Sequence, residues 1–319
     1  MSSRPDNRPC ASTARQNAVV DDLARSDVIV AGRRLEVLAA APGSGRALVF
    51  HSGTPSAAVP FAPLVEAAAH AGLRLVTWSR PGYGGSEPAP GRAVADVAAD
   101  AAAVLDALGV GEFVTLGWSG GGPHALACAA LLPGRCAAAA TLAGVAPYGA
   151  DGLDFLAGMG KENVEEFSLA LRGEEALAPW LQEQAAALAA ITAEDVAGSL
   201  GGLVSPVDTA SLTGEFAEYL AETFRRAVST GIAGWRDDDL AFVRDWGFDL
   251  TSIDVPVSVW QGHQDLMVPP SHGRWLADQL PRVRRHLHPG EGHLSLAVGA
   301  LDRIVADLAG IGGVSRTAG

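Results

Sequence analysis

One stretch, residues 113–132 (FVTLGWSGGGPHALACAALL), constrains the fold more than any other part of the chain. Its apolar start, Phe113–Leu116, is typical of a buried strand, and the run from Pro123 onward is typical of a helix. Between them, residues 117–121 read GWSGG, a G-x-S-x-G motif in a strand–turn–helix context. Such a turn presents the hydroxyl of Ser119 beside the unpaired N–H groups of a helix N-terminus. The stretch therefore predicts a nucleophilic serine, with a merely small residue in a Gly-rich turn as the alternative.

The rest of the chain alternates short apolar runs with helical patterns, which indicates a mostly parallel central sheet flanked by helices. Strands are expected at 34–40, 47–50, 74–78, 113–116, 137–142, 257–260 and 283–288, and helices at 59–71, 93–108, 123–132, 271–280 and 294–308. From about residue 151 to residue 250 the signals are helical only. The sequence thus predicts an α/β fold whose core is formed by residues 28–148 and 251–311, with residues 149–250 as an inserted helical cap.

Composition narrows the class of protein. Hydrophobic residues make up 48% of the chain and charged residues 18%, which suits a large globular core. No apolar stretch is long enough to span a bilayer, and residues 1–27 are polar without a hydrophobic signal core, so we expect a disordered N-terminal tail. Cys10, Cys128 and Cys136 show neither an even framework nor metal-ligand spacing, which favours a cytoplasmic location.

The net charge of −13 is concentrated in one segment. Residues 151–250 hold 19 acidic and 6 basic residues, whereas the rest of the chain is balanced. Because there is no basic stripe, nucleic acid is not an expected partner, and we expect the acidic helices to be solvated. The run Asp237–Asp239 lacks the glycine and spaced ligands of a calcium loop, so it is predicted to be a solvated acidic turn, and no metal or organic cofactor is implied.

A serine hydroxyl needs a base to take its proton as it attacks. His293 lies in the Gly-rich sequence GEGHL that follows the last predicted strand and opens the last helix, so its imidazole can reach the sheet edge. The less well placed alternatives are His51, His70, His124, His263, His272, His286 and His288.

The base in turn needs an acceptor that fixes its tautomer, and Asp265 is the candidate. It lies just past the strand predicted at 257–260, although an Asx-turn or a helix cap is the common role of such an aspartate. The loop after the strand at 137–142 offers no carboxylate. The order Ser119, Asp265, His293 is the nucleophile–acid–base order of one known fold.

Two backbone N–H groups are expected to bind the oxyanion that forms during attack. One is that of Gly120, next to the nucleophile. The other is assigned to Thr54 in the sequence HSGTP, where Gly53 lets the backbone turn inward and Pro55 sets the exit.

Taken together, these motifs resemble the α/β-hydrolase fold family, the group with esterase-like, lipase-like and proline-iminopeptidase-like members. They run in family order through most of residues 30–310, and they are HSGTPS at 51–56, SRPGYGGSEP at 79–88, GWSGGG at 117–122, GHQDLMVP at 262–269 and GEGHLSL at 290–296. Two departures stand out. Ser52 occupies the position before the loop glycine where the family has His, and Trp118 precedes the nucleophile instead of following it, which disfavours a peptidase.

The resemblance implies a serine hydrolase that forms an acyl-enzyme on Ser119 with a small to medium carboxylic ester. Amides, lactones, C–C bonds, cofactor-free peroxidase chemistry, acyl transfer and iminopeptidase activity stay open, and a non-catalytic ligand-binding protein is the remaining alternative. Epoxide hydrolase and dehalogenase chemistry need an aspartate where Ser119 stands. The expected partner is a small molecule rather than a membrane, and the oligomeric state is open.

The inserted helices are expected to close over Ser119 as a lid and to shape the substrate pocket. Pocket candidates are Trp118, Gly53, Tyr83, Phe155 and Met159, with Leu156, Phe167, Trp180 and Phe216 as further apolar residues. For each apolar residue at helical spacing, an ordinary core position is the alternative.

Overall fold

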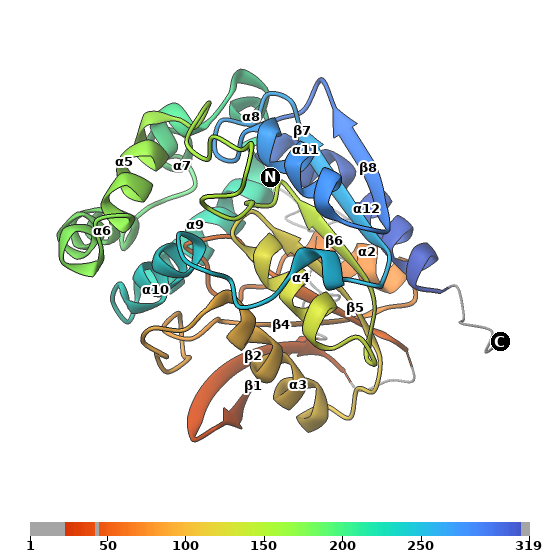
Figure 1. Cartoon of the computed structure of the whole chain (residues 1–319). Coiled ribbons are helices and arrows are strands. Elements are labelled where there is room, and N and C mark those ends of the chain that lie inside the picture. Colours follow the sequence, from red (N-terminus) through yellow and green to blue (C-terminus); the bar gives the residue numbers. More distant parts are fainter. Residues whose placement is uncertain (1–22, 42–44, 314–319) are drawn as a thin grey trace, which may run out of the picture.

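The computed structural model describes residues 23–41 and 45–313, and within them eight strands form one sheet in the order β1-β2-β4-β3-β5-β6-β7-β8 (Figure 1). The pairs β1–β2 and β2–β4 are antiparallel and all the others are parallel. The strands are β1 (Leu23–Val30), β2 (Arg33–Ala40), β3 (Ala47–His51), β4 (Arg74–Trp78), β5 (Phe113–Trp118), β6 (Cys136–Leu142), β7 (Val257–Gly262) and β8 (Val283–His288). The prediction of a mostly parallel sheet flanked by helices is confirmed.

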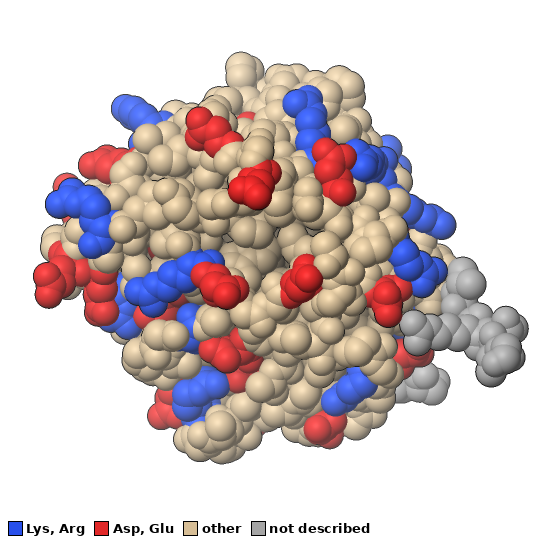
Figure 2. Space-filling model, viewed as in Figure 1, with Lys and Arg blue, Asp and Glu red and all other residues tan. Residues whose placement is uncertain are grey.

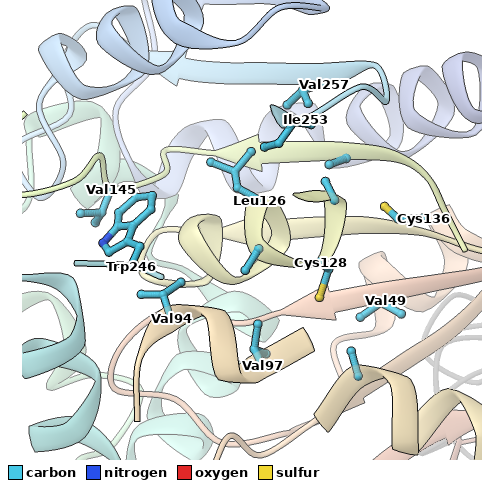
Figure 3. Packing of buried hydrophobic residues seen from close by; sticks show 14 of the residues in the cluster. Val49, Val94, Val97, Leu126, Cys128, Cys136, Val145, Trp246, Ile253 and Val257 are labelled. Carbon is cyan, nitrogen blue, oxygen red and sulfur yellow. The ribbon is translucent and has the colours of Figure 1, made fainter. Parts of the chain in front are cut away.

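Helices cover both faces of this sheet, and successive strand residues alternate between the two cores. Leu48 of β3 belongs to the core under α2 (Ala62–His70) and α12 (Leu294–Gly312). The next residue, Val49, belongs to the core under α3 (Val97–Ala107), α4 (Gly121–Leu131) and α11 (Pro270–Gln279). Figure 3 shows the second of these cores around Leu126. A short 3₁₀ turn at Val94–Asp96 directly precedes α3.

The segment between β6 and β7 carries six further α-helices in the described chain, and in Figure 1 most of them gather at one side of the sheet. They are α5 (Lys161–Ala170), α6 (Glu174–Leu188), α7 (Val196–Leu200), α8 (Pro206–Ser211), α9 (Gly214–Val228) and α10 (Ala233–Phe242), with 3₁₀ turns at Gly201–Leu203 and Leu250–Ser252. The apolar face of α6, with Leu177 and Leu181, packs on Trp235 and Leu240 of α10. We call this segment, residues 149–250, the cap.

Strand β1 was not expected, because a disordered tail was predicted for residues 1–27. Residues 1–22 lie outside the described part, but Leu23–Val30 pairs along its whole length with β2. This strand is largely exposed, and the polar residues Arg25, Ser26 and Asp27 interrupt its apolar residues, so it lacks the long apolar run that marks a buried strand.

Charges of both signs are interspersed over the face seen in Figure 2, without a continuous field of one sign. Among the described residues, no helix combines the length and the apolar character that crossing a membrane requires.

Candidate active site

Ser119 occupies a strained turn between β5 and α4. Its φ of 55° lies in the left-handed region, which is costly for a residue with a side chain and tends to occur at functional sites. The Ser119 N–H donates to the carbonyl of Leu142 at 2.9 Å, and the Ser119 carbonyl accepts from Gly122 at the same distance. A Cβ on Gly117 would lie 2.2 Å from the carbonyl oxygen of Gly121, so the flanking glycines are a steric requirement of this turn.

The loops after β7 and β8 bring Asp265 and His293 together. His293 Nδ1 lies 2.8 Å from Asp265 Oδ2, and both side chains are buried. The other carboxylate oxygen of Asp265 accepts the N–H groups of Met267 and Val268 at 2.9 and 2.8 Å, so the acceptor is itself fixed. Because Nδ1 is engaged with the carboxylate, Nε2 is the nitrogen left to take a proton.

Burial lowers the pKa of His293, but the charge and hydrogen bond of Asp265 and the charge of Asp208 outweigh it. The net effect raises the pKa above the ordinary value of 6.5. An imidazole that gains a proton readily is suited to act as a general base.

Ser119 and His293 line the same cavity, which has a volume of about 160 Å³. The ring of Trp118 lies beside the imidazole of His293, with 5.8 Å between the ring centroids. Cap residues form much of the wall. The apolar lining consists of Trp118, Trp180, Leu188, Leu200, Leu203, Leu220, Phe224, Trp235, Met267 and Leu294, and the polar lining includes Ser56, Glu162, Asn163, Glu166, Gln184 and Ser199.

The loop after β3 approaches Ser119 from the neighbouring strand. A Cβ on Gly53 would lie 3.8 Å from Ser119 Oγ, and a Cβ on Gly120 would lie 2.5 Å from Thr54 Oγ1. The side chain of Arg80 donates to the carbonyls of Ser52 and Gly53 at 2.6 and 2.8 Å. In a planar trans peptide the N–H points away from the C=O, so the Thr54 N–H points away from Arg80. Gly120 and Thr54, the residues that carry the two predicted oxyanion donors, are neighbours.

Arg80 is held in place by Asp238 of α10, and this corrects the prediction of a solvated turn at Asp237–Asp239. All three aspartates are buried inside a helix. Asp238 pairs with Arg80 at 2.6 Å and with Arg92 at 2.7 Å. Burial raises the pKa of Asp238, but the two guanidinium groups outweigh it and hold that pKa well below its usual range.

Three pocket candidates do not line the cavity. Tyr83 is buried and donates its hydroxyl to Asp238 Oδ2 at 2.9 Å. Phe155 packs edge-on against Phe167 and His272, and Met159 belongs to the core of the α3–α4–α11 face. Their apolar character reflects core packing, which was the alternative interpretation. Trp118 and Gly53 do line the cavity, as does Trp180. The further apolar candidates, Leu156, Phe167 and Phe216, do not line it and pack in the cores.

Two residues that organise the site were not among those predicted from the sequence. Arg80 lies in the SRPGYGG sequence, where an arginine within a Gly-rich loop after a strand was a usable signal. Asp238 had no local signal, because its partners Arg80 and Arg92 lie about 150 residues away in the sequence.

His124, the histidine one turn into α4, is buried 3.5 Å from Asp238. Burial lowers its pKa to about 4, so it is neutral at neutral pH.

The chain belongs to the α/β-hydrolase fold family, since the model of that family matches residues 46–300. It is also similar to a non-heme haloperoxidase from Rhodococcus erythropolis, with 28% identity over 271 residues that cover 83% of this chain and 92% of the relative.

Solved structures of the same fold agree with this assignment. An α/β hydrolase fold protein from Nakamurella multipartita is 25% identical with a TM-score of 0.59, covering 91% of this chain and all of the other. The esterase RhEst1 from Rhodococcus sp. ECU1013 is 21% identical with a TM-score of 0.61, covering 91% and 99%. The second likeness concerns the fold alone.

Proposed function

We propose that the protein is a serine hydrolase that acts on a small to medium carboxylic ester through an acyl-enzyme intermediate. One observation carries this: a strained Ser119 and an imidazole bonded to a buried carboxylate line a single cavity. In this mechanism His293 Nε2 takes the hydroxyl proton as Ser119 Oγ attacks the carbonyl, and returns it to the leaving alcohol. Water activated by the same imidazole then hydrolyses the acyl-enzyme.

The N–H groups of Gly120 and Thr54 are proposed to bind the oxyanion of each tetrahedral intermediate. Their support is the proximity of the two residues and the orientation that Arg80 imposes on the Gly53–Thr54 peptide. One such donor contributes about 3 kcal/mol of transition-state stabilisation. Side-chain substitutions cannot remove these N–H groups, but substituting Arg80 would change the orientation of the Gly53–Thr54 peptide.

The cavity favours an acyl group that is mainly apolar. Its wall is rich in tryptophan and leucine. Each methylene of an acyl chain that is buried against such a wall stabilises the bound state by about 0.8 kcal/mol. The small volume, about 160 Å³, disfavours long chains.

Labelling with a fluorophosphonate and turnover of p-nitrophenyl esters of rising chain length test the proposal. We expect the wild type to be labelled and to hydrolyse short and medium esters, whereas Ser119→Ala abolishes both. His293→Ala and Ser119→Ala should cost similar factors, and the double variant should lose no more than either, because the groups act as a unit. Absence of Ser119-dependent labelling contradicts the proposal.

The haloperoxidase relative favours one second candidate, cofactor-free peroxide chemistry at the same serine. Hydrogen peroxide in place of water would convert the acyl-enzyme to a peracid, which oxidises halide. Bromination of phenol red in acetate buffer with hydrogen peroxide measures it. Ser119-dependent labelling and bromination without ester turnover would favour this second function over the first.

A further inference from the structure

The carboxylate of Asp208, on the cap helix α8, is fully buried against the loop that carries His293. Its Oδ2 accepts the N–H of His293 at 3.1 Å, and its Oδ1 accepts the N–H groups of Leu294 and Ser295 at 2.8 and 2.9 Å. These N–H groups lie at the start of α12, where a helix has no backbone partners of its own for them. Among the described residues, no side chain at the start of α12 provides a cap. The cap segment therefore supplies the N-terminal cap of a core helix.

The fit around this carboxylate is tight. A Cβ on Gly292 would lie 2.3 Å from Asp208 Oδ2, so the loop backbone presses directly on the carboxylate. Ser205, the N-cap of α8, donates its hydroxyl to the same oxygen at 2.8 Å. The carboxylate of Asp208 is thus held by the N-cap residue of its own helix and binds the backbone of the His293 loop.

We infer that Asp208 is a positioning residue for catalysis, which fixes the His293 imidazole over Ser119 by binding the backbone of residues 293–295. The inference rests on the proposed hydrolase function. Two carboxylates then act on one imidazole. Asp265 sets its tautomer through Nδ1, and Asp208 sets the position of the ring by binding the backbone of His293. Because Asp208 belongs to the cap, any displacement of α8 moves the catalytic base.

The same carboxylate also acts on the imidazolium electrostatically. The charged groups that influence His293 are Asp265, on the loop after β7, and Asp208, on α8, and both favour the protonated form. A carboxylate at the N-terminus of α12 is further stabilised by the helix dipole. Removing its charge should therefore lower the pKa of His293, which a purely structural contact would not do.

The pH dependence of fluorophosphonate labelling of the full chain tests this inference, because it reports the free-enzyme pKa of the base. We expect Asp208→Asn to lower the plateau rate by about 10- to 100-fold, as a displaced base does. Its acid limb should move to lower pH, because the charge of Asp208 favours the protonated imidazole. The matched control is Asp195→Asn, because Asp195 is an exposed aspartate of the cap whose carboxylate binds only Thr192 among the contacts of the described residues. This control should behave as wild type.

A second variant separates charge from position. Ser205→Ala keeps the Asp208 charge but removes one bond that holds it, so the plateau should fall while the acid limb stays at the wild-type pH. A folded Asp208→Asn with the wild-type plateau and acid limb overturns the inference. If Asp208→Asn does not accumulate as folded protein, a wild-type plateau in Ser205→Ala overturns it instead. Lack of Ser119-dependent labelling in the wild type itself would instead contradict the proposed function.

Discussion

Three consecutive aspartates of α10 show how far the surroundings of one residue decide its charge. Asp238 faces Arg80 and Arg92 and is held ionised. For its neighbour Asp239, burial first, and then the charge and hydrogen bond of Glu166, raise the pKa well above 3.8 and outweigh the opposing charge of Arg92. Burial also raises the pKa of Glu166, whose carboxylate accepts a hydrogen bond from Trp235 Nε1. The pair therefore favours sharing a proton.

This pair makes a prediction for stability. A group whose folded pKa is raised stabilises the fold below its unfolded pKa, about 4, and loses that contribution as the pH rises through the folded value. Asp239→Asn mimics the protonated form and should raise the free energy of unfolding at pH 8 by on the order of 1 kcal/mol, with no gain near pH 4. Urea unfolding at both pH values measures it, with exposed Asp254→Asn as control. A gain equal at both values would contradict the shared proton.

At the scale of elements, the site depends on how closely β5, α4 and the loop after β3 approach. A Cβ on Gly121 would lie 2.0 Å from the carbonyl oxygen of His51, a backbone atom that cannot move aside. The first turn of α4 thus touches the end of β3, and this contact sets the distance between the Ser119 turn and the predicted oxyanion loop.

Gly121→Ala should therefore push these elements apart. We expect a loss of about 1–3 kcal/mol in the free energy of unfolding, as overpacking produces, and at least a 100-fold loss of ester turnover. Gly134→Ala is the matched control, because an added Cβ there meets nothing within 4 Å. Thermal unfolding and p-nitrophenyl ester assays measure both variants, and a Gly121→Ala enzyme with normal turnover would refute the steric requirement.

At the scale of the whole molecule, the cap and the core build the candidate active site together. It supplies Asp208 to the His293 loop and Asp238 to the Arg80 network, and it lines the cavity with Trp180 and Leu220. Both aspartates are buried where cap and core meet. Part of the acidic excess of residues 151–250 therefore makes internal contacts and does not face solvent.

Because the carboxylates raise the pKa of His293, the activity and the stability should respond to pH in opposite directions. The proposed mechanism needs the neutral imidazole of His293, so kcat/KM for an ester should rise along an acid limb centred above pH 6.5. The contribution of His293 to stability is present below about pH 6.5 and declines as the pH rises through the raised value. Ester kinetics from pH 5 to 9 measure the first effect, and an acid limb below 6.5 would contradict the environment described for the imidazole.

Much of the architecture could be predicted because strands and helices leave local patterns. The runs at 74–78 and 283–288 became β4 and β8 with the predicted bounds, and the Ser119 turn needs glycines that are visible in the motif itself. Asp265 and His293 were predicted from their place after two strands, and parallel strands bring such loops to one edge.

The sequence by itself determined the sheet except for β1, the turn at Ser119 and the three residues proposed for catalysis, because these follow from periodicity and short motifs. Only the tertiary structure decided which aspartates are buried, which apolar residues line the cavity, and that Asp208 binds the backbone of the His293 loop. The contacts of Asp208 with His293 and of Asp238 with Arg80 join residues 85 and 158 positions apart, and a carboxylate facing an arginine has the same local sequence as one facing water.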